Sequence, residues 1–202
     1  MPDQISPTKG NLLKLKKSLA LAKVGFDLLD RKRNILVRET MSMIDSASKI
    51  QELIDSSYYK AYRALQSANI QLGIVEEIAN SIPIENGLSL SSRSVMGVEI
   101  PTVALDIQPV KNYYGFHRTT VELDEAYVMF DNVKKFTARL AEIENSVYRL
   151  AEGIRKTQKR ANALKNIIIP RFDNQCKQIT SALEEKEREE FSRLKVIKKI
   201  ID

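Results

Sequence analysis

Several residue types are scarce in this 202-residue sequence, and each shortage excludes a class of protein. A single cysteine excludes a disulfide framework within the chain. One cysteine and one histidine are also too few for a zinc site of the usual Cys/His kind. Tryptophan is absent and aromatic residues make up only 6% of the chain, which is little for a globular core of this size. No apolar run approaches the ~18 residues of a membrane-spanning helix, and no apolar signal segment follows Met1. We therefore expect an intracellular protein with no metal site and no direct membrane insertion.

Basic residues outnumber acidic ones by 32 to 26, and the excess lies at the two ends of the chain. Residues 1–40 contain nine basic and four acidic residues, and residues 151–202 contain thirteen and eight. Acidic residues interrupt the basic groups, and no stacking aromatic residues accompany them, so the footprint of a nucleic-acid-binding protein is missing.

The strongest pattern is a heptad repeat that begins near Asn11 and runs to Ile54. Apolar residues recur there at alternating spacings of three and four, and only Arg33 and Thr40 interrupt them. A long helix with one apolar stripe needs a partner of similar length. The apolar positions are Leu12, Leu15, Leu19, Ala22, Phe26, Leu29, Leu36, Met43, Ala47, Ile50 and Ile54.

Beyond Ser57 the pattern is less regular and predicts a wider or shifted apolar face. We expect the first helix to continue to about Asn80, with a candidate bend at Gly73, and to end before Pro83. Residues 1–82 then form the N-terminal long helix. The apolar residues of its second part are Tyr58, Tyr59, Tyr62, Leu65, Ile70, Leu72 and Ile74.

Residues 83–118 form an insert that is richer in proline and glycine than the flanking segments. Two short β-prone runs meet at Met96 and Gly97, which predicts a β-hairpin with its turn at these two residues. Pro101 would confine its strand to an edge position. The alternative is an irregular loop.

Residues 119–202 form the second long helix, which supplies the missing partner. Thr119 and Glu122 have the spacing of a capping box, and the apolar seam resumes after them. After Ile168 the phase slips as in a stutter, and Pro170 should bend the helix there. The seam positions are Ala126, Met129, Val133, Phe136, Leu140, Ile143, Val147, Leu150, Ile154, Thr157, Ala161, Leu164 and Ile168, then Phe172, Cys176, Ile179, Leu183, Phe191, Leu194, Ile197 and Ile201.

These segments predict an all-α protein built as a long antiparallel two-helix coiled coil with a short β-hairpin-containing insert between the helices. Both basic ends should then lie at one end of the coiled coil and the insert near the other. Carboxylates alternate with Lys and Arg as on a solvated helix, and neither a phosphate-binding loop nor a nucleophile elbow is present. We expect no catalytic residue and no cofactor.

Four blocks and the hairpin segment together resemble the D subunit of the V-type ATPase and of the archaeal-type ATP synthases. The resemblance covers nearly the whole chain in order. The four blocks are PTKGNLLKLKKSL at 7–19, LLDRKRNIL at 28–36, TQKRANALKNIIIP at 157–170 and EREEFSRLKVIK at 187–198, and the hairpin segment is VMGVEIP at 95–101.

The resemblance implies a rotor axle, the central stalk of a rotary motor. Such an axle penetrates the hexamer of catalytic and non-catalytic A and B subunits, binds the small F subunit of the stalk, and docks on the C subunit (also called d) above the membrane ring. It would be a cytoplasmic, peripheral component on the inner face of the membrane and would hold no nucleotide. The motor's direction, synthesis or hydrolysis, and its coupled ion, H⁺ or Na⁺, both stay open. The alternative is a passive coiled-coil adaptor or scaffold.

Two sets of residues are candidates for roles in such an axle. The basic tip is expected to face the inner wall of the hexamer, or else only to keep the tip soluble; its members are Lys9, Lys14, Lys16, Lys17, Arg188, Arg193, Lys195 and Lys198. The register or bend residues are Arg33, Thr40, Thr157 and Pro170. The hairpin is a candidate for contact with the small F subunit or for regulation of hydrolysis.

Overall fold

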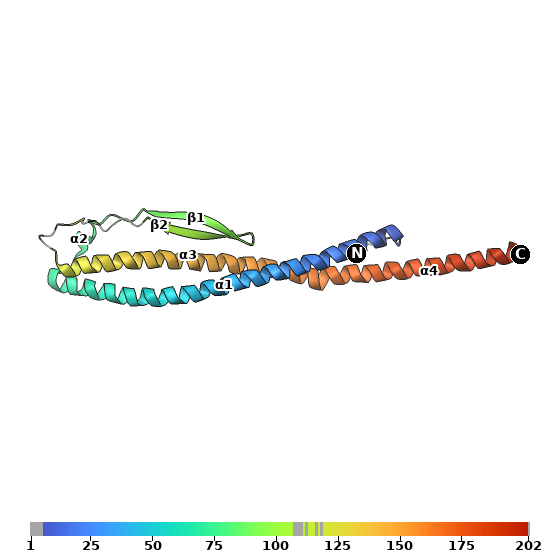
Figure 1. Ribbon diagram of the computed structural model, residues 1–202, viewed down its shortest axis with the longest axis horizontal. Helices are drawn as coiled ribbons and strands as arrows, with labels where there is room; N and C mark the ends of the chain where they lie inside the picture. The colour runs from blue at the N-terminus through green and yellow to red at the C-terminus, as the bar shows by residue number, and fades with distance from the viewer. Residues whose placement is uncertain (1–5, 107–110, 112, 116, 118, 202) are drawn as a thin grey trace. The chain divides into compact units, whose positions relative to one another are not determined.

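A computed structural model describes residues 6–106, 111, 113–115, 117 and 119–201. Its elements follow the order α1 (Lys9–Leu72), α2 (Glu76–Ala79), β1 (Leu88–Val95), β2 (Val98–Leu105), α3 (Val121–Ala163), the π-helix η2 (Leu164–Ile168) and α4 (Ile169–Ile201) (Figure 1). The predicted fold class, helical with one hairpin between the long helices, is confirmed. The chain divides into two compact units: unit 1 contains residues 1–34 and 155–202, and unit 2 contains residues 35–154.

The long helices pair in antiparallel fashion within each unit. In unit 1, Leu15 near the start of α1 packs against Cys176 and Ile179 of α4. In unit 2, Leu36 packs against Leu150, and Gln71, near the end of α1, donates to the carboxylate of Glu122 at the start of α3 (2.9 Å).

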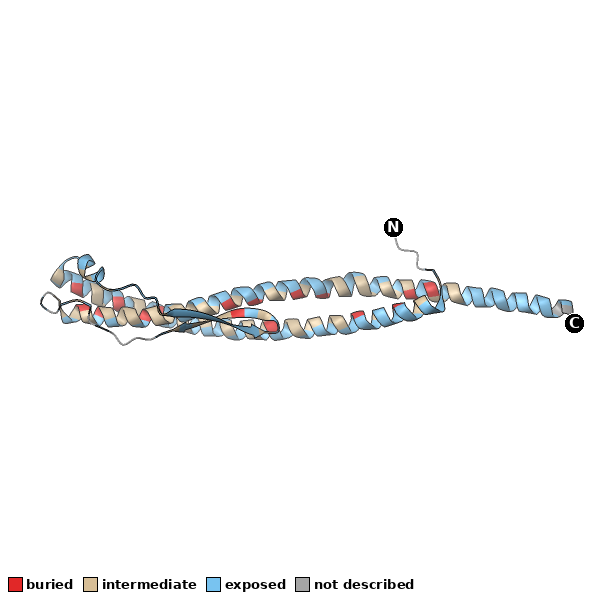
Figure 2. Cartoon of the chain, turned by 90° about the horizontal axis from the view of Figure 1, so that it is seen from above, coloured by how far each residue is buried: buried red, intermediate tan, exposed pale blue. Residues whose placement is uncertain are grey.

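The predicted apolar seam is confirmed along α1 from Leu12 to Ile54. Every apolar residue assigned to it is buried or half-buried. Figure 2 shows buried and intermediate positions recurring along the helices. Apolar residues that the heptad pattern leaves out, such as Leu21 and Leu28, are exposed. The period of 3.5 residues therefore identifies the buried stripe correctly.

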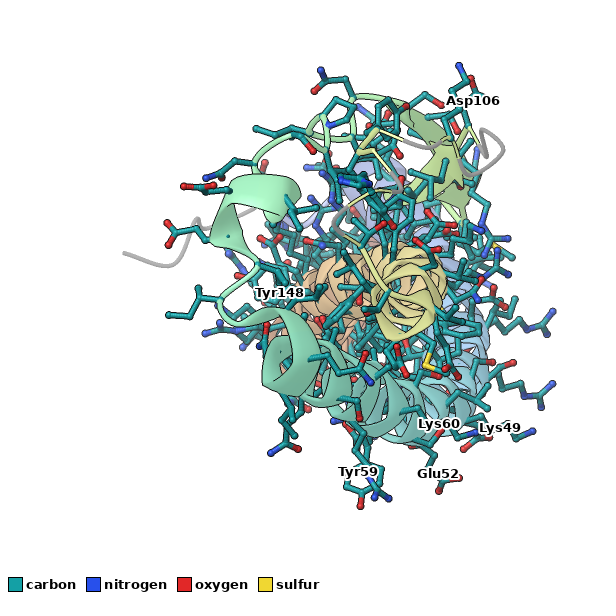
Figure 3. All side chains as sticks on the ribbon, turned by 90° about the vertical axis from the view of Figure 1, so that its left-hand side faces the viewer. Lys49, Glu52, Tyr59, Lys60, Asp106 and Tyr148 are labelled. Atoms are coloured by element: carbon teal, nitrogen blue, oxygen red, sulfur yellow. The ribbon has the colours of Figure 1, made fainter. Side chains whose placement is uncertain are left out.

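The predicted apolar face between Ser57 and Asn80 is wrong in its main members. Tyr59 and Tyr62 are exposed, and Figure 3 shows Tyr59 pointing outward from α1. The seam is instead continued by Ala61 and Ala68, both fully buried. Alanine side chains leave little room between helices, so the tyrosine rings lie on the flank.

Helix α1 ends at Leu72, eight residues before the predicted Asn80. Gly73 has φ +77°, a left-handed conformation that glycine adopts without a steric penalty, and its N–H donates to the carbonyl of Asn69 (3.0 Å). The glycine that was expected to bend the helix terminates it.

The phase slip before Pro170 coincides with the π-helical turn η2, which ends two residues earlier. Proline has no N–H, and its ring clashes with the carbonyl four residues back, which lies inside η2. A π-turn closes at a spacing of five rather than four residues, so it absorbs the extra residue of the slip. The seam residues Leu164, Ile168 and Phe172 thereby stay half-buried, although two successive spacings of four residues separate them.

Strands β1 and β2 form an antiparallel hairpin whose closing pair is Val95 and Val98. Met96 (φ 50°) and Gly97 (φ 73°) form the two-residue turn, and positive φ at both positions is the signature of a type I′ turn. Pro101 lies opposite Ser92 in the ladder.

The hairpin packs on the helix pair of unit 2. Ile100 is 1% exposed and packs with Leu36 and Leu150, while Val98 lies against Gly153 of α3. A β-carbon added at Gly153 would lie 2.7 Å from Val98 Cγ2, so the hairpin approaches α3 as closely as a glycine allows.

No helix in the described ranges has an apolar stretch long enough to cross a membrane.

Substitution Gly153→Ala tests the close approach of Val98 in the hairpin to α3. Within a helix, Gly→Ala normally stabilises by about 0.5–1 kcal/mol, but at this position the added methyl collides with a β-branched side chain. We expect Gly153→Ala to lower the free energy of unfolding in chemical denaturation, and Val98→Ala to restore part of the loss. The matched control is Gly25→Ala in α1, where the nearest atom, Leu164 Cδ1, is 3.8 Å away and the normal stabilisation should appear. Equal effects at both glycines would contradict the packing described.

Candidate interaction surfaces

The eight basic-tip residues all lie in unit 1, on the first turns of α1 and on α4, and all are exposed. Lys9 Nζ lies 2.9 Å from Glu187 Oε1, which brings the start of α1 beside α4. The hydrogen bond to Glu187 and its negative charge raise the pKa of Lys9. The structure therefore brings part of the predicted tip together, with an acidic residue between the basic ones.

Residues 184–198, which we call the end segment of α4, are exposed at every position. Figure 2 shows this end of α4 continuing alone past the start of α1. The predicted seam residues Phe191, Leu194 and Ile197 are 52–63% exposed, so the expectation that the seam is covered to the C-terminus is wrong for the described residues. Arg193 lies 3.8 Å from Glu189, and Lys195 lies over the ring of Phe191 at 4.6 Å from its centroid.

The polar residues at seam positions make contacts that apolar residues would not. Arg33 donates to Gln158 Oε1 on α3 (2.9 Å) and pairs with Asp30 (2.7 Å), while Thr40 donates to the carbonyl of Leu36 (2.8 Å). Thr157 is 5% exposed. Arg33 thus ties α1 to its partner helix by a side-chain hydrogen bond.

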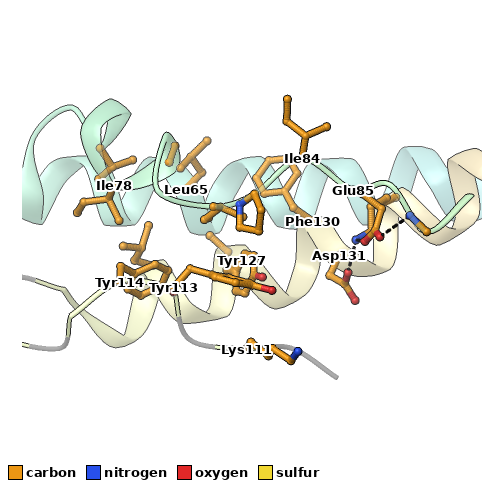
Figure 4. A pocket seen from close by; sticks show the side chains of 18 of the residues that line it. Leu65, Ile78, Ile84, Glu85, Lys111, Tyr113, Tyr114, Tyr127, Phe130 and Asp131 are labelled. Carbon is orange, nitrogen blue, oxygen red and sulfur yellow. Dashed lines mark hydrogen bonds and ion pairs between the residues drawn. The ribbon is translucent and has the colours of Figure 1, made fainter. Parts of the chain in front are cut away.

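Unit 2 contains a groove that sequence reasoning missed, which we call the aromatic groove (Figure 4). It has a volume of about 770 Å³ and is lined by the end of α1, by α2, by the connection to β1, by Lys111, Tyr113 and Tyr114, and by the first turns of α3. Aromatic side chains of Tyr113, Tyr114, Tyr127 and Phe130 form part of its wall. The tyrosine count was visible in the sequence, but the segments that meet here are distant in the chain.

Ion pairs and one tyrosine hydrogen bond fix the rim of the groove. Lys134 contacts both Glu85 (2.7 Å) and Asp131 (2.8 Å). Burial alone would lower the pKa of Lys134, but its hydrogen bonds to these two carboxylates outweigh burial and raise it. Burial and the hydrogen bond to Asp124 (2.7 Å) raise the pKa of the Tyr114 hydroxyl. The groove therefore has an apolar wall with a charged, internally paired rim.

Cys176 is buried in the seam, as predicted, and His117 is exposed. Among the described residues, no group of three His, Cys, Asp or Glu side chains is placed to hold a metal ion. The exposed apolar residues at the end of α4 are a feature of protein–protein contact, and a concave site with an apolar wall and a few polar groups is a feature of ligand binding.

The comparison with known proteins agrees with this organisation. The sequence matches the family of ATP synthase D subunits over residues 11–199. It is 46% identical to the D subunit of the V-type ATP synthase of Thermotoga neapolitana, over 96% of this chain and 97% of that protein. It is also similar to the D subunits of two A-type ATP synthases, from Methanobrevibacter smithii (38% identity, 99% of this chain, 89% of that protein) and Pyrococcus furiosus (37%, 100% and 98%).

The matched range extends from the first turns of α1 almost to the end of α4, so it includes the seam, the hairpin and the exposed end segment. This chain belongs to the family of ATP synthase D subunits.

Proposed function

We propose that this chain is the central axle of a rotary V/A-type ATP synthase or ATPase. It turns inside the catalytic hexamer and transmits torque between that hexamer and the membrane ion-translocating ring, and it performs no catalysis itself. The observation that carries the proposal is the match to the D-subunit family over both long helices, together with a helix end that the described chain leaves uncovered. A paired coiled coil gives stiffness, and the uncovered end gives a surface for other subunits.

The partners in this proposal are the A and B subunits of the hexamer, the small F subunit of the stalk and the C (or d) subunit of the rotor. The chain would lie on the cytoplasmic side as a peripheral part of the membrane-bound complex. The names of its relatives as V-type and A-type ATP synthase subunits support membership in such a complex.

The basic tip supports contact with the wall of the hexamer. Exposed lysines are screened by salt and make loose pairs, so they tolerate turning better than interlocking apolar side chains. Lys14, Lys16, Lys17 and Lys198 are exposed and have no ion-pair partner in the described part of the chain. These four residues are therefore available for an acidic partner surface.

Native mass spectrometry of the reconstituted complex tests the axle. The chain is mixed with the catalytic hexamer of its source organism, with and without the small F subunit. We expect one copy of this chain per hexamer, because an axle occupies a single central position. Absence of binding, with the chain forming a homodimer alone, would favour the passive scaffold.

Neutralising the tip tests its contact with the hexamer. Exposed ion pairs are worth about 0.2–1 kcal/mol each, so replacing the four available lysines by Gln should weaken hexamer binding by roughly 1–4 kcal/mol at low salt. The effect should shrink as salt is raised. A matched control replaces four exposed basic residues of unit 2, which are Arg38, Lys49, Lys60 and Arg139. Unchanged binding of the tip variant at low salt would rule the contact out.

Arg33 is proposed to fix the register of the helix pair, as single polar residues at seam positions do in other coiled coils. Leu15→Cys places a thiol against Cys176, so a disulfide reports the native register. We expect Arg33→Leu to raise the melting temperature by a few degrees and to lower the disulfide yield, since it replaces a polar seam residue that specifies register at a cost in stability. Arg31→Leu, on the exposed face, is the control. The register role is absent if Arg33→Leu changes neither quantity.

A further inference from the structure

The two edges of the hairpin differ in how their backbone groups are satisfied. The two-residue turn makes Val95 and Val98 a hydrogen-bonded pair, and such pairs then alternate along the ladder. The N–H and C=O groups of Glu99 and Val103, and the C=O of Pro101, therefore point away from β1.

Helix α3 covers this outer edge of β2. The side chain of Arg149 donates to the carbonyl of Glu99 (3.4 Å), and the N–H of Val103 donates to the Glu142 carboxylate (3.3 Å). The hydroxyl of Ser146 lies 3.3 Å from the carbonyl oxygen of Pro101. Residues 142, 146 and 149 lie on one stripe of a helix, so α3 takes the place of a third strand. Pro101 contributes by having no N–H to satisfy.

The opposite edge, formed by β1, has no such cover. By the same alternation, the N–H and C=O groups of Leu88, Leu90, Ser92 and Ser94 point outward, and within the described residues nothing hydrogen-bonds to them. Residues 88–94 are all exposed. Natural sheets usually protect an open edge with charged residues, proline or a bulge. Over its eight regular pairs β1 has no lysine, proline or bulge, and its one charge is Arg93, on the same face as the buried Ile100.

The side chains around this edge indicate what would fit it. On the outward face, Leu88 and Leu90 are 49% and 71% exposed and continue the apolar surface of Val103 and Leu105. Arg93 is the single charged residue of β1 and lies 3.7 Å from Glu39, a long contact that leaves most of its donors available. An added strand would therefore bring apolar residues at alternate positions and a carboxylate near Arg93.

We propose that the open edge of β1 binds an extended, acidic segment of another component of the motor by β-strand addition. Backbone hydrogen bonds to Leu88, Leu90, Ser92 and Ser94 supply the binding, and Arg93 selects the acidic partner. The inference rests on the proposed function, because it places the added strand in the assembled motor.

Hydrogen exchange at residue resolution tests the proposal, with the chain alone and in complex with the hexamer and the other stalk components. In the chain alone, the ladder amides of Ser91 and Arg93 should exchange slowly and the outward amides of Leu90 and Ser94 quickly. In the complex, we expect the outward amides to slow by about ten-fold or more.

Substitution Ser92→Pro removes an outward N–H without removing a ladder bond, just as Pro101 does on the opposite strand. It should abolish the slowing at Leu90 and Ser94, whereas Ser92→Thr should preserve it. Slow exchange at Ser91 and Arg93 in the Ser92→Pro chain will show that the hairpin still forms. Retained slowing at Leu90 and Ser94 in that variant would overturn the proposal.

The charge of the partner is tested by a matched pair of variants. Both Arg93→Gln and Glu39→Gln break the 3.7 Å contact, but only the first removes the cation. We expect Arg93→Gln to reduce the slowing and Glu39→Gln to keep it; equal effects would overturn the acidic partner.

Three further outcomes overturn the strand addition. A complex that forms without slowing of the outward amides refutes this inference and leaves the axle intact. Slowing in the chain alone that grows with its concentration means that a second copy occupies the edge. Failure of any complex to form removes the proposed function and the inference together.

Discussion

The seam between α1 and its antiparallel partner helices is the constraint on which the rest of the structure depends. A pair of helices can bury only one stripe of each, so the core is a single line of side chains and its phase must be kept along the whole length. The fully buried Leu36 and Leu150 mark the place where the hairpin residue Ile100 adds a third layer to this line.

The sequence predicted those parts of the fold that local chemistry decides. The heptad spacing of Leu12, Leu36 and Ile54 specified the buried face because a helix repeats its faces regularly. The turn at Met96 and Gly97 was predictable because two-residue hairpins need residues that accept positive φ, and glycine does so readily. The basic tip was visible as composition, although its partial pairing with Glu187 was not.

Features that depend on distant segments could not be predicted from the same patterns. The spacing of the α1 tyrosines predicted a wider or shifted apolar face, whereas the buried positions are Ala61 and Ala68, whose small side chains fit between the helices. The π-turn before Pro170 was expected as a slip in phase, but its geometry depends on how the backbone accommodates the proline ring. The aromatic groove needs several separate parts of the chain to meet, and no short motif encodes that meeting.

Helix α3 contacts two neighbours through two different stripes. Val147 and Leu150 belong to the seam, while Glu142 and Arg149 hydrogen-bond to the backbone of β2. An insertion of seven residues within this part of α3 would keep the phase of the seam. It would also move part of the second stripe about 10 Å along the helix axis, away from the backbone groups of β2 that it contacts. Evolution can therefore lengthen or shorten this coiled coil by whole heptads on either side of residues 142–149, but not within them. Homologues of different length should align without gaps across this stretch.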